Sequence, residues 1–267
     1  MSTPDWQSIT RLATTLARDA GAELRRRFGR QVTITLKSTL DPVTDADQAA
    51  ETLIRQGIQA HWPTHSIQGE EQGETPGTET VRWIVDPLDG TVNYAHGFPQ
   101  FAVSIAVADA QGVQCGVVYD PMREELFTAR RGQAAWLNGV PLAVSHTTLL
   151  QGALLATGFP YNRQHNPDNN HREFAALNLL TQGVRRAGSA ALDLAYVASG
   201  RLDGYWEQHL SPWDVAAGAL LVHCAGGTVS TYDGTPHDGV GPQIVASNGH
   251  LHAALLAELA QVRQRQA

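Results

Sequence analysis

Hydrophobic residues recur at helical spacing near the N-terminus of the chain. The apolar positions are Trp6, Ile9, Leu12, Ala13, Leu16, Ala20 and Leu24. Their spacing of three and four residues predicts an amphipathic helix that ends near Gly29. The polar end of this helix reads "LRRRFGR". A basic run at a helix C-terminus is typical of a solvated face that complements the helix dipole.

A short strand and a second helix are expected next. The alternating segment "VTITL" at 32–36 predicts a strand, and Asp41-Pro42 marks a turn. Thr44 and Asp45 follow as candidate N-caps of a helix, because their short side chains accept hydrogen bonds from free backbone N–H groups.

The pattern then changes twice along the chain. Between about 82 and 137, short apolar segments separated by Gly, Pro, Asn or Asp predict strands, most of them in one antiparallel sheet. From about 150, strands alternate with helices beginning at Asn170, Ser189 and Pro212, and a last helix follows, which is typical of an α/β arrangement. We therefore expect an N-terminal α+β half (1–148) and a C-terminal α/β half (149–267) that form one compact unit with a shared cleft.

Composition narrows the class of protein. With 267 residues, 42% hydrophobic and 17% charged, the chain is long enough to bury a large core. The formal net charge of −7 argues against general affinity for nucleic acid or anionic membranes. No apolar segment approaches the roughly 18 residues of a membrane span, and the N-terminus lacks a signal-peptide pattern, so we expect a cytoplasmic protein. Cys115 and Cys224 are expected to be free thiols.

The segment "WIVDPLDGT" at 83–91 ends an apolar run on two carboxylates. A single Asp at such a place is usually a turn or cap residue. Asp86 and Asp89 are three positions apart, however, and a turn fixed by Pro87 would direct both side chains and the Leu88 carbonyl into one space. Mg²⁺ prefers such oxygen ligands, together with water and substrate phosphate.

The next two residues suit a phosphate. Gly90 lets the backbone approach a ligand closely, and a helix beginning at Thr91 would present free N–H groups to an anion. This segment therefore indicates a place where metal and phosphate meet.

Two further acidic segments are ambiguous alone. Glu70 and Glu71 lie in "IQGEEQGE", which suits a projecting metal ligand or an ordinary loop equally well. Asp214 follows Pro212 at a predicted helix start, where the helix dipole stabilises a carboxylate without any functional role.

Together these segments resemble a known family. "GEE" at 69–71, "WIVDPLDGTVNYAHGFPQFAVSIAV" at 83–107 and "WDVAAGALLVHCAGG" at 213–227 are similar to the signature segments of the inositol monophosphatase family, which comprises Mg²⁺-dependent, lithium-sensitive phosphomonoesterases. "LDPVTDAD" and "GSAALDLAYVASGRLDGYWE" also fall in family order, so the resemblance covers nearly the whole chain. It implies a layered α-β-α-β-α sandwich, an α+β or α/β fold like that of fructose-1,6-bisphosphatase, and a homodimer.

The resemblance implies two to three Mg²⁺ ions. Glu70, Asp86 and the Leu88 carbonyl would hold one metal, and Asp86, Asp89 and Asp214 would hold a second. A weaker third ion would lie near Glu70. Most of these ligands fall in the N-terminal half.

Catalytic roles are implied for Glu70, Asp47 and Thr91. Thr91 paired with Asp47 would orient the attacking water, while Gly90 and Thr91 backbone groups would meet the phosphate. Asp47 matches the family motif, which leaves Asp45 as the helix cap.

Substrate contacts are implied for the C-terminal half as well. Glu207 would accept a substrate hydroxyl, and Gly188, Ser189 and Ala190 would lie beside the substrate ring, with Asp89 and Asp214 also facing the substrate. We therefore expect a phosphomonoesterase acting on a small polyol phosphate, most simply inositol monophosphate. Sister enzymes that act on histidinol phosphate, a sugar bisphosphate, NADP or phosphoadenosine phosphate share the metal motifs and stay open as alternatives.

Two other classes of function are weaker alternatives. A phosphodiesterase or nuclease would use similar chemistry, but the acidic balance and the lack of a basic, aromatic groove disfavour it. A binding role with the transcription machinery, in which the arginines of "LRRRFGR" and "VRRAG" contact a partner, is the other alternative.

Overall fold

The structure is a computed structural model that describes residues 4–30, 34–38, 41–237 and 239–264. The helices are α1 (Trp6–Arg27), α2 (Asp45–His61), α3 (Thr91–Ala95), α4 (His171–Leu180), α5 (Ala190–Ala198), α6 (Pro212–Cys224) and α7 (His252–Gln264), with a 3₁₀ turn η1 (Leu150–Gly152). The strands of the first half are β1 (Ile34–Ser38), β2 (Asp41–Thr44), β3 (Ser66–Gly69), β4 (Gly73–Thr75), β5 (Arg82–Asp89), β6 (Ala102–Asp109), β7 (Gly112–Asp120), β8 (Glu125–Arg130), β9 (Ala135–Leu137) and β10 (Val140–Pro141). Those of the second half are β11 (Leu154–Thr157), β12 (Gly183–Arg185), β13 (Gly204–Gln208), β14 (Thr228–Ser230) and β15 (Gln243–Ser247).

The larger sheet has eight strands in the order β10-β9-β8-β7-β6-β5-β3-β4. Its neighbours run antiparallel except for the β3–β5 pair, which is parallel. Alternate residues of β5 face opposite sides, so that Ile84 packs with one core cluster while Trp83 and Val85 pack with another. Because both faces are buried, these strands read as continuous apolar runs.

The smaller sheet has five strands in the order β12-β11-β13-β15-β14. β11 runs parallel to β12 and β13, whereas β15 runs antiparallel to β13 and β14. Its two faces also belong to different cores, because Tyr205 packs toward α5 and α6 while Trp206 packs toward α4 and α7.

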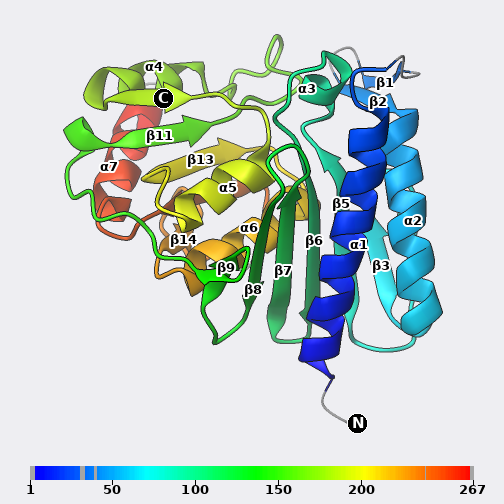
Figure 1. Cartoon of the computed structure of the whole chain (residues 1–267). Helices are drawn as coiled ribbons and strands as arrows, with labels where there is room; N and C mark the ends of the chain where they lie inside the picture. The colour runs from blue at the N-terminus through cyan, green and yellow to red at the C-terminus, as the bar shows by residue number, and fades with distance from the viewer. Residues whose placement is uncertain (1–3, 31–33, 39–40, 238, 265–267) are drawn as a thin grey trace.

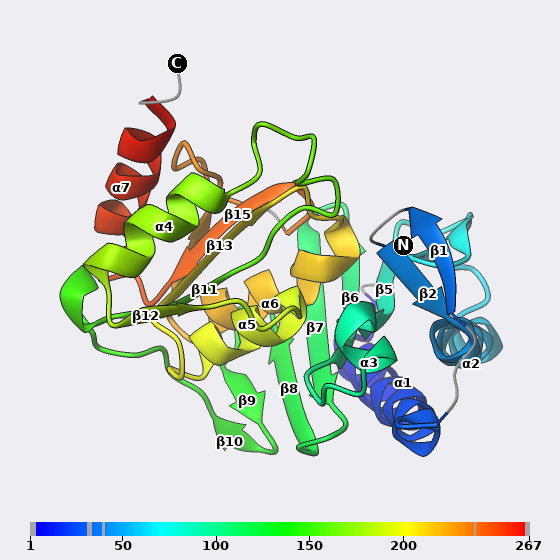
Figure 2. The same cartoon turned by 90° about the horizontal axis from the view of Figure 1, so that it is seen from above.

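The elements form five layers (Figures 1 and 2). Helices α1 and α2 cover one face of the eight-stranded sheet, α5 and α6 lie between the two sheets, and α4 and α7 cover the outer face of the five-stranded sheet. The predicted α-β-α-β-α sandwich is confirmed. The boundary near residue 148 stays a prediction.

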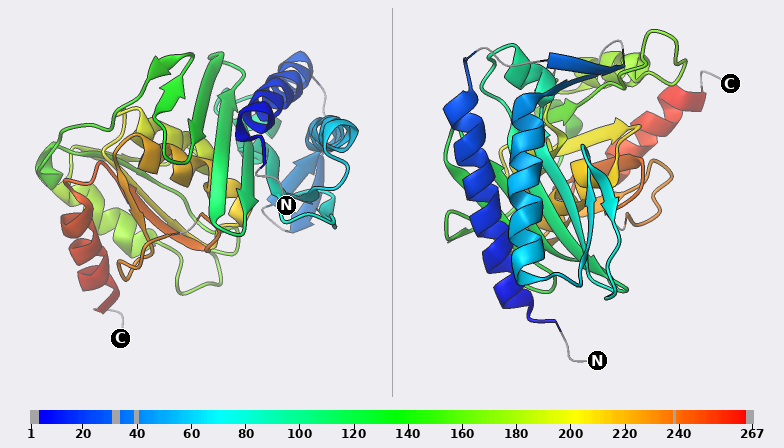
Figure 3. Two further views of the ribbon diagram at one scale, coloured as in Figure 1. Left: turned by 90° about the horizontal axis from the view of Figure 1, so that it is seen from below. Right: turned by 90° about the vertical axis from the view of Figure 1, so that its right-hand side faces the viewer.

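The first helix agrees with its predicted span. Figure 3 shows α1 beside α2, with α1 running almost the whole height of the sheet. Its basic end is taken up by ion pairs: Arg25 with Glu124, Arg26 with Glu23, and Arg27 with Glu23 and Asp45. Three arginines of the basic run therefore have carboxylate partners within the protein.

Three local predictions need correction. The strand that contains "RWIVD" does not end at Asp86 but continues to Asp89. Asp45 is not the cap of α2, because Thr44 occupies that position and Asp45 is the first helical residue, 2.8 Å from Arg27. Asp41 begins a strand, β2, that pairs with β1, whereas the sequence indicated only a turn. The start of the predicted strand at 32–36 lies outside the described residues.

None of the helices in the described ranges is both long enough and apolar enough to cross a membrane.

Candidate active site

A bulge at the end of β5 brings Asp86 and Asp89 to one cavity. Asp86 pairs with Ser104 of β6 and Asp89 pairs with Ala102, so three steps along β5 match two along β6. The extra residue bends the strand and redirects its side chains, as bulges near functional sites do. Asp86 Oδ1 accepts a hydrogen bond from the Leu88 N–H at 2.9 Å, which fixes the turn between the two acids.

Thr91 and Asp47 meet as predicted. The Thr91 hydroxyl lies 3.0 Å from Asp47 Oδ1 and 3.0 Å from the Leu88 carbonyl oxygen, and it can donate to either. Asp47 Oδ2 also accepts from Thr44 N at 2.8 Å, which closes the capping box of α2. Asp47 is therefore both the third helical residue of the capping box, in which Thr44 is the cap, and a partner of the candidate site.

Gly90 makes possible the turn between the end of β5 and the start of α3. Its φ of 101° lies in the left-handed region, and a Cβ there would lie 2.9 Å from the Gln100 carbonyl oxygen. α3 begins directly after it at Thr91, which is the helix start that the interpretation of this segment as a phosphate site requires.

Asp89 reaches across the cavity to the start of α5. Its carboxylate accepts from Ser189 Oγ at 2.5 Å, from Ala191 N at 2.8 Å and from Ala190 N at 3.3 Å. Free N–H groups and the positive end of the helix dipole stabilise a carboxylate at this position. The segment predicted to lie beside the substrate thus contacts a predicted metal ligand.

Asp214 and Glu70, together with Asp86 and Asp89, form the acidic wall of the cavity. Asp214 is the third residue of α6 and accepts from Ser211 N at 2.7 Å in a second capping box, with Pro212 at the first helical position as predicted. Glu70 follows β3 directly, and its N–H donates to the Val85 carbonyl at 3.2 Å. Both side chains line, with Asp86, Leu88, Asp89, Gly90 and Thr91, a cavity of about 260 Å³.

The electrostatics of this cavity are unbalanced toward negative charge. Burial raises the pKa of Asp47 and of Asp89 to about 6 each. Burial and the neighbouring carboxylates, Glu70 first, raise the pKa of Asp86 well above its ordinary value, and burial with Asp89 does the same for Asp214. None of the described residues that line this cavity is a lysine or an arginine. Removing a proton from these acids is costly because the carboxylates are buried and no lysine or arginine among the described lining residues offsets their charge.

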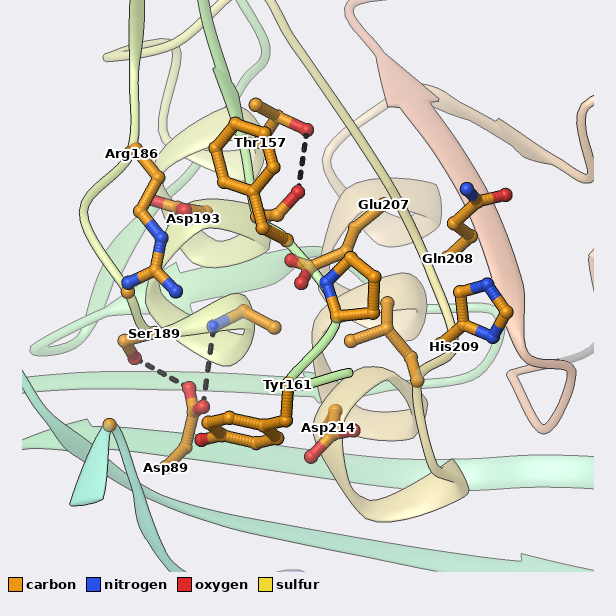
Figure 4. A pocket seen from close by; sticks show the side chains of 17 residues that line it. Asp89, Thr157, Tyr161, Arg186, Ser189, Asp193, Glu207, Gln208, His209 and Asp214 are labelled. Atoms are coloured by element: carbon orange, nitrogen blue, oxygen red, sulfur yellow. Dashed lines mark hydrogen bonds between the residues drawn. The ribbon is translucent and has the colours of Figure 1, made fainter. Parts of the chain in front are cut away.

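A second cavity of about 110 Å³ shares Asp89, Gly90 and Asp214 with the first (Figure 4). Glu207 of β13 lines this second cavity, and its Oε2 accepts a hydrogen bond from the hydroxyl of Tyr205. Burial raises the pKa of Glu207 to about 7. The predicted hydroxyl acceptor and the predicted phosphate segment therefore border adjoining spaces.

Sequence reasoning missed several residues of this second cavity, among them Asp193, Arg186 and Tyr161. Asp193 is 2% exposed, and burial raises its pKa well above its ordinary value. Arg186, which the sequence suggested for a protein partner, lines the cavity and is its one arginine or lysine among the described lining residues. The signal was present, since Arg186 lies two positions before Gly188, but a basic pair alone does not distinguish a ligand contact from a solvated loop.

The carboxylates already use several oxygens in hydrogen bonds. Asp89 places both oxygens on donors of the α5 segment, while Asp86 and Asp214 each place one on a backbone N–H. Over the described ranges, no group of three or more His, Cys, Asp or Glu side chains is arranged so that it could hold a metal ion as it stands. The metal assignment stays a prediction.

Comparison with known proteins gives a consistent result. The model of the inositol monophosphatase family matches residues 5–264. The chain is 45% identical over 265 residues to the inositol-1-monophosphatase of a Synechocystis species, covering 98% of this chain and 92% of that protein. It is 46% identical over 260 residues to the Nus factor SuhB of Pseudomonas aeruginosa, covering 95% of this chain and 96% of that protein.

Solved structures agree with these relatives. The inositol monophosphatase of Anabaena (Nostoc) superposes with a TM-score of 0.87 at 46% identity, covering 97% of each chain. The extragenic suppressor protein suhB of Bartonella henselae gives a TM-score of 0.89 at 38% identity, covering 94% of this chain and 98% of that one.

The fold thus defines a layered α+β protein of the phosphatase type. The chain belongs to the inositol monophosphatase family. Membership supports a hydrolase that removes phosphate from a substrate.

Proposed function

We propose that this protein is a Mg²⁺-dependent phosphomonoesterase that hydrolyses a small polyol phosphate, with inositol monophosphate as the leading substrate. The observation that carries the proposal is the adjoining pair of cavities, one walled by Glu70, Asp86, Asp89 and Asp214 and the other lined by Glu207. The carboxylate-lined cavity suits cations that bind a phosphate, and the cavity lined by Glu207 suits a hydroxylated ring. An inositol-1-monophosphatase among the relatives supports the same substrate.

The donor chemistry fits Mg²⁺. Carboxylate and carbonyl oxygens are the ligands that Mg²⁺ prefers, and Glu70, Asp86, Asp89, Asp214 and the Leu88 carbonyl would hold two to three ions. The raised pKa values of Asp86, Asp89 and Asp214 support this, because burial, with some repulsion from neighbouring carboxylates, raises them and a bound cation would offset both effects. When bound, Mg²⁺ would supply positive charge for the phosphate oxygens and lower the pKa of water.

The chain's own residues would position the reactants and carry the proton. Thr91 would accept a hydrogen bond from the attacking water while its hydroxyl donates to Asp47 Oδ1, so that Asp47 can take up the proton. With a pKa of about 6, Asp47 is largely ionised at neutral pH and available as that acceptor. Gly90 and Thr91 backbone groups would meet the phosphate. Glu207 would accept a substrate hydroxyl, beside the segment of Gly188, Ser189 and Ala190.

Phosphate release from a substrate panel tests the proposal. The panel contains myo-inositol 1-phosphate, histidinol phosphate, fructose 1,6-bisphosphate, NADP and phosphoadenosine phosphate, each with and without Mg²⁺ and with EDTA. We expect release that needs Mg²⁺, stops with chelator and is fastest with inositol phosphate. Preference for another ester would keep the chemistry and change the substrate, whereas activity that persists in chelator would contradict the metal assignment.

Assembly, location and inhibition belong to the same proposal. We infer a cytoplasmic homodimer in which the halves 1–148 and 149–267 act as one unit around the shared cleft, and inhibition of turnover by Li⁺. Light scattering of the purified chain and turnover in LiCl, compared with NaCl at equal ionic strength, test the dimer and the inhibition.

A binding role with the transcription machinery is the second candidate. The names of several relatives favour it, since Nus factor SuhB proteins of Pseudomonas aeruginosa and Escherichia coli are 46% and 45% identical to this chain. An inactive Asp214→Asn variant separates the two functions. A role in transcription that survives loss of hydrolysis would establish binding as independent.

A further inference from the structure

The buried face of α2 carries charged residues at helical spacing. Asp47, Glu51 and Arg55 follow one another at intervals of four, so they lie on one face of the helix. They are 0%, 0% and 6% exposed, respectively. Burying a charged side chain costs free energy unless the side chain is paired and hydrogen-bonded, so each of these residues should have polar partners.

Glu51 holds the backbone of the turn after β3. Its Oε2 accepts from the Glu71 N–H at 2.7 Å, and its Oε1 accepts from the Gln72 N–H at 3.0 Å. Oε1 also accepts from Arg55 Nε at 2.7 Å. One carboxylate therefore fixes two successive backbone amides directly beside Glu70.

Arg55 holds the other side of the same turn. Its guanidinium donates to the Gly73 carbonyl and, at 2.8 Å, to Thr75 Oγ1. Gly69 is packed against the pair, because a Cβ there would lie 2.3 Å from Glu51 Oε1 and 2.8 Å from Arg55 Nη2. Only a residue without a side chain lets the strand pass so close to the ion pair.

We propose that Glu51 and Arg55 are positioning residues that set the place of Glu70 in the candidate metal site. The inference rests on the proposed function, since it concerns metal binding at that site. On the same face of α2, Asp47 accepts a hydrogen bond from Thr91, and Glu51 accepts one from the N–H of Glu71, next to Glu70. α2 therefore fixes the position of Thr91 relative to that of Glu70. Mutation of a residue that orients a metal ligand without touching the metal typically lowers metal affinity 10–100-fold.

Calorimetric titration with Mg²⁺ alone is the direct test. We expect Glu51→Gln to weaken Mg²⁺ binding about ten-fold or more and to raise the Mg²⁺ concentration for half-maximal turnover in parallel. The KM for the phosphate ester, measured at saturating Mg²⁺, should stay within about two-fold of wild type, because Glu51 does not line either cavity. Arg55→Lys, which keeps the charge but loses the planar fork, should give a smaller loss.

Two further variants separate positioning from simple unfolding. The Glu51→Gln/Arg55→Met double variant leaves no lone buried charge, so it should fold even if a single variant does not. Asp120→Asn is the matched control: Asp120 is also fully buried, accepts from Met122 N at 2.8 Å and Arg123 N at 3.0 Å, and pairs with Arg123. Its turn lines neither cavity, so this variant should bind Mg²⁺ like wild type.

The outcomes distinguish this inference from the proposed function. Wild-type Mg²⁺ affinity in a folded double variant would overturn the positioning role and leave the phosphatase proposal intact. Equal losses in the double variant and Asp120→Asn would also overturn it, because the effect would then be one of stability. A wild-type protein that binds Mg²⁺ but hydrolyses no ester would overturn the proposed function, while calorimetry would still decide the role of Glu51 and Arg55.

Discussion

The Thr91 hydroxyl lies 3.0 Å from Asp47 Oδ1, although the two residues are 44 positions apart. This contact joins the first turn of α2 to the first residue of α3 in a buried place. Burial raises the pKa of Asp47 to about 6, and the hydrogen bonds from Thr44 and Thr91 oppose that rise. Together these hydrogen bonds, those from Thr44 first, favour the ionised form of Asp47, which is the form that the proposed role as proton acceptor requires.

Thr91→Val removes the hydroxyl with little change in volume. We expect kcat for phosphate release to fall about 100-fold or more, because a positioned proton relay typically contributes that much. Thr91→Ser, which keeps the hydroxyl, should retain most of the activity. Stopped-time phosphate assays at saturating Mg²⁺ measure both. Similar rates for the Val and Ser variants would exclude a proton role for the hydroxyl.

Asp89→Asn and Asp214→Asn each remove a charge from the acidic wall. We expect each to lower turnover at least about 1,000-fold while the free energy of unfolding changes by no more than about 1 kcal/mol, because Asn keeps a side-chain oxygen that can accept from the backbone N–H groups. Asp5→Asn is the matched control, because Asp5 caps α1 through Ser8 N at 3.1 Å but lies outside both cavities. Substantial turnover by either site variant would contradict the proposed metal ligands.

Gly158→Ala tests how Glu207 is held. A Cβ at residue 158 would lie 2.1 Å from both carboxylate oxygens of Glu207, so the carboxylate must move. We expect the preference among phosphate esters to change as it does in Glu207→Gln, with the Mg²⁺ requirement retained. In Gly152→Ala, the nearest atom to the new Cβ is at 3.7 Å, so this control should behave like wild type. An unchanged preference in Gly158→Ala would remove Glu207 from the substrate contacts.

Mg²⁺ should stabilise the protein more at high pH than at low pH. The folded-state pKa of Asp89 is about 6, above its ordinary value, so the metal-free folded state binds the proton more tightly than the unfolded chain does. This contribution to stability is present below about pH 4 and is lost as the pH rises through about 6. Because Mg²⁺ binds the ionised form, 100 times its Kd should add about 2.7 kcal/mol at pH 7.5.

Thermal unfolding with and without Mg²⁺ at pH 5.0 and 7.5 measures this effect. The rise in Tm should be several degrees at pH 7.5 and smaller at pH 5.0. It should shrink at both pH values in Asp89→Asn. A rise that is equal at the two pH values would show that the ion binds elsewhere.

Local patterns determined most of the secondary structure. Helical spacing in the first segment, Ser189 before α5 and Pro212 at the start of α6 each indicated an element that the structure contains. These signals are local, because they depend on side-chain periodicity and on the free N–H groups of a helix start. The motif at 83–91 also indicated the turn and the helix at Thr91, since Gly90 and the spaced acids act within a few residues.

Tertiary structure decided what the sequence left open. The bulge that carries β5 on to Asp89 depends on the register with β6, and register is set by a partner strand. Asp193 and Arg186 became part of a cavity only because α5 packs between the sheets beside β13. The hydrogen bonds of Glu51 and Arg55 to the segment after Glu70 join α2 to residues about 20 positions further along the chain. The sequence by itself therefore determined most of the elements and the chemical types available. Long-range packing, in which each contact depends on two distant segments, determined which of those groups face one another.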